Sequence, residues 1–204
     1  ELRLNQSVQA IRRKAEGFEV RTQDQSYRGH MVVNAAGIEC DRILSMVRPP
    51  DYKIIPTKGE YYLLDKSQGQ LVRHVIFQCP DENGKGVLVA PTVHGNLIVG
   101  PNSAETDRQD YATTLNGLAE VRSKAEKSVP SINFGENIRT FAGLRARRQD
   151  HGDFVVGEDD KVPGFFQIAA MQSPGLSSAL AIAVDTVSMM QKKGYFTKPK
   201  TNAA

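Results

Sequence analysis

The stretch FFQIAAMQSPGLSSALAIAVDTVSMM, residues 165–190, decides the fold of this chain. Residues 165–170 form an apolar run of the length expected for a buried strand, and residues 172–175 contain the Pro and Gly of a turn. Ser173 is expected to cap a following helix, with Pro174 as its first residue. This helix is predicted because apolar residues recur at steps of three and four, on one face: Leu176, Leu180, Ala183, Val187 and Met190.

A strand, a glycine turn and a helix in this order direct the free amides of the helix N-terminus toward an anion. Gly175 would also let a ligand approach the backbone closely. The alternative interpretation is an ordinary strand-to-helix connection that buries a core helix. The stretch by itself leaves both interpretations open.

The composition is that of a soluble globular protein. The chain has 204 residues, 40% of them hydrophobic and 24% charged, which suits one large domain or two small ones. Its net charge of +3 is too small to indicate a nucleic-acid partner. No apolar run is long enough for a transmembrane segment. Cys40 and Cys79 lie far apart, so we expect reduced thiols, no metal site and a cytoplasmic protein, with attachment to a membrane surface left open.

The first part of the chain predicts three strands and a short helix. The strands are residues 7–12, 17–22 and 27–35, and the third runs from an apolar segment into small residues. Such a strand suits a buried parallel position whose end meets a ligand or another backbone closely. Residues 38–47 then predict a helix that ends before Pro49 and Pro50, where we expect the chain to cross between domains.

The middle of the chain predicts an antiparallel sheet covered by a helix. A long amphipathic helix is expected over residues 107–129, capped by Asp107 or Asp110. Residues 94–96 suit a hairpin turn. Five strands spaced by turn residues should form the sheet, and two more follow the helix: residues 53–56, 60–64, 71–79, 86–90, 96–100, 137–148 and 153–157.

Arg145 is the best candidate for binding an anion. On a strand it shares a face with Phe141 and Gly143, and a guanidinium near apolar residues needs a planar anionic partner. For Arg147 and Arg148 a solvated basic strand end is an equal alternative. Nucleic acid is not expected, because no aromatic residues are interleaved with these charges.

His74 and a tyrosine are further candidates. His74 could act as a base or proton carrier, or could simply be a hydrogen-bonded sheet residue. Tyr61 and Tyr62 put one phenol on each face of their strand, and Tyr62 is taken as the substrate contact. No catalytic triad spacing, P-loop or metal-ligand pattern is present in the sequence.

Five motifs together resemble a known family, the D-amino-acid-oxidase-like FAD-dependent oxidoreductases. They look most similar to the branch of glycerol-3-phosphate and L-2-hydroxyglutarate dehydrogenases, and they cover nearly the whole chain in the family's order. The motifs are VVNAAG (32–37), PTKGEYYLL (56–64), GKGVLVAPTVHGNLIVGP (84–101), FAGLRAR (141–147) and QSPGLSSALAIA (172–183).

The resemblance implies an α+β fold with two domains. Residues 1–49 and 139–192 would form an incomplete, Rossmann-like FAD-binding portion, residues 50–138 a mostly antiparallel substrate domain backed by the long helix, and residues 193–204 a tail. The implied reaction oxidises a small anionic hydroxy or amino compound, such as glycerol 3-phosphate or a 2-hydroxy acid, by hydride transfer to flavin. The alternative is a module without flavin that binds an anionic metabolite or a protein.

The resemblance also assigns residues. Arg145 would hold the substrate carboxylate or phosphate. The implied FAD contacts are Val8 at the adenine, Ala36 and Gly37 near the ADP part, and Gly175, Leu176 and Ser177 at the flavin ring.

The dinucleotide fingerprint GxGxxG of this family is missing from these 204 residues. We therefore expect the C-terminal part of a longer enzyme, which by itself binds little FAD. Apolar residues that would pack against the missing part of the FAD-binding domain should then form an exposed patch that favours self-association. These residues are Val32, Val33, Ala35, Ala36, Leu180, Ala183 and Val187.

Overall fold

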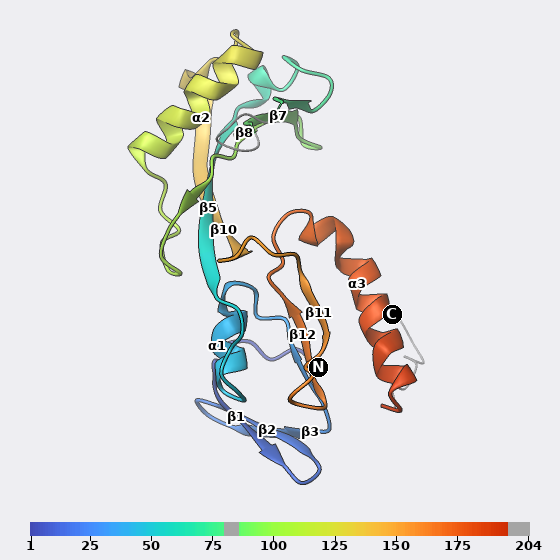
Figure 1. The fold of residues 1–204 in the computed structure, drawn as a ribbon. Coiled ribbons are helices and arrows are strands. Elements are labelled where there is room, and N and C mark those ends of the chain that lie inside the picture. The colour runs from blue at the N-terminus through green and yellow to red at the C-terminus, as the bar shows by residue number, and fades with distance from the viewer. Residues whose placement is uncertain (80–85, 196–204) are drawn as a thin grey trace. The chain divides into compact units, whose positions relative to one another are not determined.

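A computed structural model describes residues 1–79 and 86–195. The chain divides into two compact units (Figure 1). Unit 1 contains residues 1–55 and 146–204, and unit 2 contains residues 56–145. No helix in the described ranges is both long and apolar enough to cross a membrane.

The described residues of unit 1 form two three-stranded sheets, two α-helices and one 3-10 helix. In the first sheet β1 (Val8–Lys14), β2 (Gly17–Thr22) and β3 (Ser26–Gly29) are antiparallel neighbours. In the second, β12 (Phe165–Ala169) lies between β11 (Val155–Glu158), which is antiparallel, and β4 (Val32–Asn34), which is parallel. The helices are η1 (Gly37–Glu39), α1 (Cys40–Ser45) and α3 (Gly175–Lys192).

The single strand expected over residues 27–35 is wrong. This segment forms β3 and β4, which belong to different sheets. The interruption follows from pairing: Val32 must lie beside Phe165 in the parallel ladder, and its amide bonds the Gly164 carbonyl at 3.0 Å. The predicted strand at residues 165–170 is confirmed as β12.

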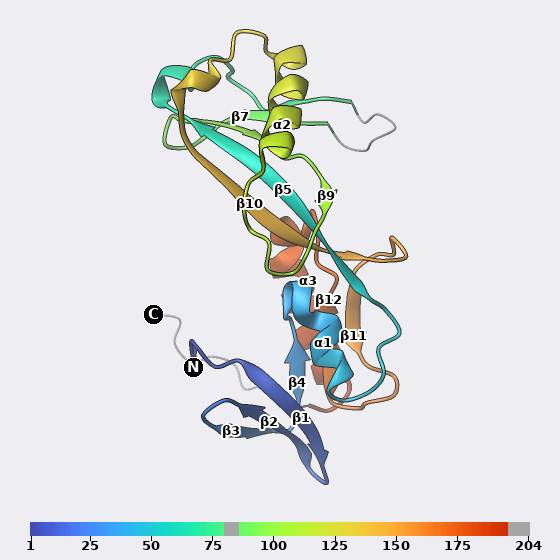
Figure 2. The same ribbon diagram turned by 90° about the vertical axis from the view of Figure 1, so that its left-hand side faces the viewer.

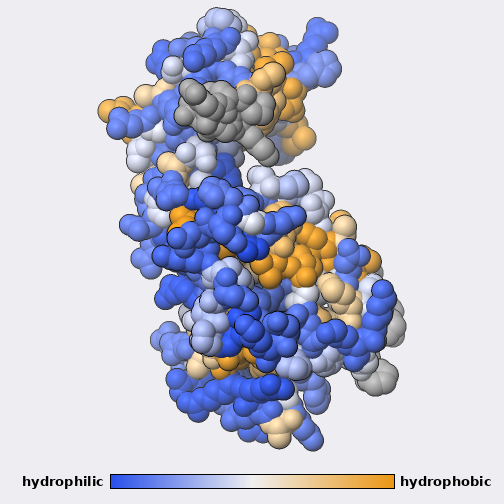
Figure 3. Space-filling view, viewed as in Figure 1, coloured by the Kyte–Doolittle hydropathy of each residue, from blue (hydrophilic) through white to orange (hydrophobic). Residues whose placement is uncertain are grey.

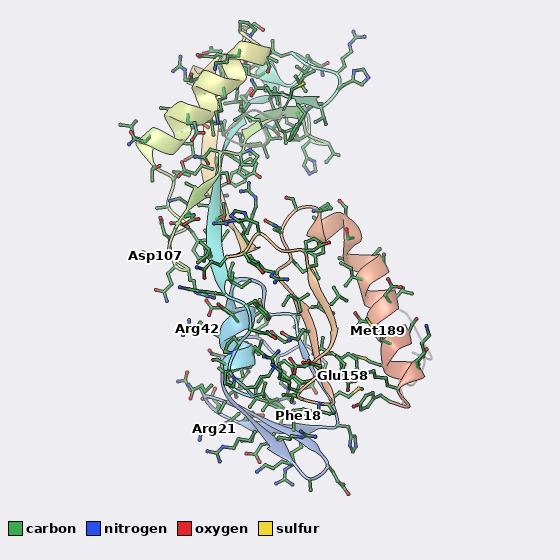
Figure 4. All side chains as sticks on the ribbon, viewed as in Figure 1. Phe18, Arg21, Arg42, Asp107, Glu158 and Met189 are labelled. Carbon is green, nitrogen blue, oxygen red and sulfur yellow. The ribbon has the colours of Figure 1, made fainter. Side chains whose placement is uncertain are left out.

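Side chains from both sheets form the core of unit 1. The rings of Phe18 on β2 and Phe165 on β12 have centroids 6.3 Å apart (Figure 4). Arg48, after α1, forms an ion pair with the buried Asp159, with 2.6 Å between Nη2 and Oδ2. Asp159 also accepts from Gln167 Nε2 at 2.9 Å. Hydrogen-bond partners therefore replace water around the buried Asp159 carboxylate.

Unit 2 is built on one antiparallel sheet and one α-helix, as the sequence predicts. Helix α2 (Leu115–Ser128) lies across one face of the sheet (Figure 2). The strand order is β10-β5-β8-β7-β6, with β9 paired to β5. The strands are β5 (Ile54–Leu64), β6 (Ile76–Phe77), β7 (Leu88–Pro91), β8 (Leu97–Gly100), β9 (Ala104–Glu105) and β10 (Asn137–Arg148), and the 3-10 helices are η2 (Lys66–Gln68) and η3 (Phe134–Glu136).

Several predicted bounds in unit 2 are wrong. Residues 53–56 and 60–64 belong to one strand, β5, and the strand expected over residues 71–79 shortens to β6. The helix expected from Asp107 begins only at Leu115, with Thr114 as its N-cap. Asp110 does not cap a helix, because its carboxylate instead accepts from Lys58 Nζ at 2.7 Å.

The beginning of α2 is fixed by a buried carboxylate on β5. Glu60 is 1% exposed, and its Oε1 accepts from Thr114 Oγ1 at 3.0 Å and its Oε2 from Thr114 N at 3.2 Å. A negative charge at a helix N-terminus is favourable. A Cβ at Gly117 would lie 2.1 Å from Glu60 Oε2, so the helix can approach the carboxylate only with glycine there.

Helix α3 exposes most of its apolar face. Leu176 is 94% exposed, Leu180 83% and Val187 41%, so this face is exposed as expected for Leu180 and Val187, whereas Met190 is buried. The segment that follows the helix bonds to Glu158 at the end of β11. Tyr195 Oη donates to Glu158 Oε1 at 2.9 Å, and Lys193 forms an ion pair with Glu158. Figure 3 shows hydrophobic residues gathered over α3. Val33, Ala35 and Ala36 are also exposed.

The Lys58–Asp110 ion pair should make unit 2 sensitive to acid. The Lys58 ammonium and the Thr106 hydroxyl lower the pKa of Asp110 from 3.8 to about 2. A carboxyl with a depressed folded pKa stabilises the fold above its unfolded pKa and loses that effect as the pH falls through the folded pKa. We expect Asp110→Asn to lower stability at neutral pH and to flatten the fall between pH 3.8 and about 2 in urea unfolding. Asp107→Asn, in the same loop, is the control and should leave the profile unchanged.

The exposed face of α3 should cause self-association of the 204-residue chain. Apolar patches larger than about 300–600 Å² are unusual on soluble monomers. We expect light scattering to show dimers or larger species, and Leu180→Glu to shift them toward monomer. Leu115→Glu, on the 86% exposed leucine of α2, is the matched control and should change little. A clean monomer of the unmodified chain at high concentration would contradict the expectation.

Candidate functional site

The face of the unit 2 sheet opposite α2 brings together residues from β5 and β10. Tyr61 and Phe141 stack there, with ring centroids 5.1 Å apart and an interplanar angle of 8°. Gly59 lies two residues before Tyr61, and Arg145 four residues after Phe141, so all four share the face by strand alternation. We call this surface the open face.

Arg145 is a half-buried guanidinium without an acidic partner among the described residues. Its Nη2 donates to the Asn102 carbonyl at 3.5 Å, a distance at the limit of a hydrogen bond. Arg48 in unit 1 is also sequestered, but it bonds Asp159 and Asp51. A guanidinium has five donors. Most of the donors of Arg145 are therefore available to an anion placed on the open face.

Tyr62 lies on the opposite side of the sheet. Its hydroxyl donates to the Leu118 carbonyl of α2 at 3.3 Å, and its ring packs edge-on against Phe134 at 4.9 Å. Burial raises the pKa of this phenol. The structure thus puts Tyr62 in the core beneath α2, and the tyrosine on the face of Arg145 is Tyr61. The strand alternation predicted one phenol on each face, and the structure puts Tyr62, the predicted substrate contact, on the face away from Arg145.

His74 lies in a bend before β6 instead of on a strand. Its side chain is exposed and makes no hydrogen bond to a described residue. No contact in the described ranges connects it with Arg145. The arrangement on the open face therefore forms without His74.

Five of the six residues predicted to contact FAD follow two adjacent strands of unit 1. Ala36 and Gly37 follow β4, and Gly175, Leu176 and Ser177 follow β12 and begin α3. Because β4 and β12 are parallel, their carboxyl ends lie at the same sheet edge, where α/β proteins bind ligands. Val8 is different, since it begins β1 in the other sheet, opposite Thr22.

The local backbone at this edge suits a ligand with phosphate or carbonyl oxygens. The N-cap of α3 is Pro174 instead of Ser173, and no side chain caps the helix. Leu176 and Ser177 are exposed. Gly37 has φ +57°, and a Cβ there would meet nothing within 4 Å. The residues of this edge therefore fit the cofactor that the resemblance implies, through amides and open space.

Sequence reasoning put Phe141 on the face of Arg145 but missed its stacking with Tyr61, and it missed the contributions of Gly59 and Asn102. A signal for the stacking was available, because aromatic residues on facing strands pair often. It could not be used, since β5 and β10 are far apart in sequence and nothing local predicts that they are neighbours.

Comparisons with known proteins identify the family of the chain. The family model for FAD dependent oxidoreductases (DAO) matches residues 1–189. A glycerol 3-phosphate dehydrogenase from Caloramator mitchellensis is 42% identical over 98% of this chain and 42% of its own length. A glycerol 3-phosphate oxidase from Mycoplasma genitalium is 31% identical over 82% of this chain and 44% of its own length.

Solved structures show the same fold. An L-alpha-glycerophosphate oxidase from Mycoplasma pneumoniae with FAD bound has a TM-score of 0.86 and 26% identity, over 97% of this chain and 52% of its own. A glycine oxidase from Geobacillus kaustophilus matches in fold, with a TM-score of 0.80 and 20% identity over 96% of this chain and 50% of its own. The chain spans about half the length of the relatives it matches. The resemblance is confirmed, and the chain belongs to the family of DAO FAD-dependent oxidoreductases.

Proposed function

We propose that this chain supplies the substrate site and part of the FAD site of a dehydrogenase or oxidase acting on a small anionic hydroxy or amino compound. Glycerol 3-phosphate is the first candidate and a 2-hydroxy acid the second. The observation that carries the proposal is Arg145, a half-buried guanidinium beside an aromatic stack and without an acidic partner in the described ranges.

Arg145 is proposed to anchor the substrate anion. Its planar fork matches both carboxylate and phosphate through two parallel hydrogen bonds. Tyr61 and Phe141 add an apolar floor beside it, which suits the carbon part of a small substrate. Anchoring the anion at one point fixes where the reacting carbon lies, and such orientation contributes part of the rate. The similarity to a glycerol 3-phosphate dehydrogenase and a glycerol 3-phosphate oxidase favours glycerol 3-phosphate.

The FAD contacts are proposed to be Val8, Ala36, Gly37 and the first turn of α3, Gly175 to Ser177. Bound FAD would supply the hydride acceptor. The N-terminus of an 18-residue helix favours negative charge, which suits the flavin edge that becomes anionic on reduction. His74 remains the proton acceptor proposed from the sequence. Tyr61 is the second candidate for that role, because it shares the open face with Arg145.

The exposed apolar face of α3 favours a second candidate, a protein-interaction module that carries no flavin. The two candidate functions predict different colours for the purified protein. The native polypeptide that contains these 204 residues should be purified yellow, with the absorption bands of oxidised flavin, if it is an oxidoreductase. A colourless native protein that cannot be reconstituted with FAD would favour the module. The isolated 204-residue chain should bind little FAD, and flavin fluorescence titration would measure this.

Removing the Arg145 guanidinium should weaken substrate binding strongly. In the FAD-loaded native protein, we expect Arg145→Ala to raise KM for the anionic substrate by about 100-fold, because truncating one partner of a charge pair costs about 2–5 kcal/mol and ~1.4 kcal/mol is tenfold. Arg122→Ala, an exposed arginine on α2 at the other face of the sheet, is the control and should leave KM unchanged. An unchanged KM of the Arg145 variant for every anionic substrate tried would refute the assignment.

A further inference from the structure

We infer that Gly59 and Asn102 are positioning residues for Arg145, and that they set its affinity for an anion. Gly59 leaves the space in which the guanidinium lies, and the Asn102 carbonyl fixes one end of it. The inference rests on the proposed function of Arg145. The residues involved all lie within unit 2.

The guanidinium of Arg145 occupies the place of a side chain at position 59. A Cβ built on Gly59 would lie 2.4 Å from Arg145 Nη2, 3.0 Å from Cζ and 2.8 Å from Pro101 Cβ. Contacts below 3.0 Å are shorter than real Cβ atoms make, so one of these groups would have to move. Arg145 therefore lies directly against the backbone of β5.

Gly59 is required for space and not for backbone conformation. It lies inside the regular strand β5, and it is absent from the glycines with positive φ among the described residues. Glycine inside a strand weakens the strand, and it often marks a close approach of another group. Here the approaching group is Arg145. The space that its guanidinium needs therefore explains a glycine at position 59, which strand stability does not explain.

Gly143 provides an internal comparison. It lies on β10, two residues before Arg145 and on the same face. A Cβ added there meets nothing within 4 Å. An added methyl group at position 143 should therefore leave the guanidinium where it is.

Asn102 connects Arg145 to β5 from the other side. Its side chain is buried, and its Oδ1 accepts from the Glu60 amide at 2.8 Å. This bond holds the Asn102 backbone beside the residue that follows Gly59. The Asn102 carbonyl then receives Arg145 Nη2 at 3.5 Å. This bond is at the limit of hydrogen-bond distance and orients Nη2 only weakly, so the space beside Gly59 decides where the guanidinium lies while its other donors remain available to an anion.

The test uses the 204-residue chain and inorganic phosphate as the probe. Binding would be followed by NMR through the Arg145 Nε–H signal and by calorimetry. We expect Gly59→Ala to weaken phosphate binding by about tenfold, which corresponds to one hydrogen bond to a charged group, and to shift the Nε–H signal of the free protein. Gly143→Ala, the matched control, should keep both the affinity and the signal.

Two further variants separate positioning from a general structural effect. In an Arg145→Ala background, Gly59→Ala should cause no additional loss of phosphate binding, because its effect acts through Arg145. If Gly59→Ala alone is too unstable to fold, the Arg145→Ala background should recover part of the lost stability, because it removes the contacts with the guanidinium while the Pro101 Cβ contact at 2.8 Å remains. An added loss of binding, or no gain in stability where the single variant fails to fold, would overturn the inference.

The outcomes also distinguish this inference from the proposed function. Phosphate binding that survives Arg145→Ala refutes the anion site itself. Phosphate binding that is lost in Arg145→Ala but keeps wild-type affinity and an unchanged Nε–H signal in Gly59→Ala refutes only the positioning role. In the FAD-loaded native protein, Gly59→Ala should raise KM for the anionic substrate and leave kcat within about twofold, since the lost contact is made equally by substrate and transition state.

Discussion

The cost of burying charge is the constraint on which both units depend. An ionised group in the interior is tolerated only when hydrogen-bonded partners replace water. In unit 1 the buried Asp159 binds Arg48, which lies 111 residues away in sequence. In unit 2 the buried Glu60 binds the start of α2, 54 residues away. These pairs join β-strands to segments that hydrophobic packing alone would not place.

Arg145 stands apart from this pattern, and that difference gives it functional meaning. Because Gly59 has no side chain, the guanidinium of Arg145 packs against the backbone of β5. No carboxylate among the described residues pairs with it. A site of this kind is stable without a ligand because the guanidinium remains half-hydrated. On the proposed function, a carboxylate or phosphate would replace this water and bond the free donors. The proposed role is therefore that of a receptor for an anion, whereas Arg48 and Asp159 form a structural ion pair.

Sequence patterns predicted the elements better than their connections. Period-two alternation and turn residues predicted the antiparallel sheet, and the 165–190 stretch predicted β12 and α3, because those signals are local. The split of residues 27–35 between two sheets was missed, since only the parallel pairing of Val32 with Phe165 decides it. The proposed anion-binding role of Arg145 was inferred from its apolar neighbours, whereas Tyr62, the predicted substrate contact, lies on the side of β5 that α2 covers. Which side of β5 α2 covers depends on Glu60 meeting Thr114, and no local pattern shows that.

Helix α3 shows the same limit of a periodic pattern. Its apolar residues recur at helical spacing, yet Leu176 and Leu180 are exposed while Thr186 is buried. The buried hydroxyl is satisfied within the helix, where Oγ1 donates to the Ile182 carbonyl at 2.7 Å, so its burial costs little. Hydrophobic residues outside and a satisfied polar residue inside reverse the usual distribution for a surface helix. The periodicity therefore identified a face that needs a partner, and the described residues of this chain leave that face exposed.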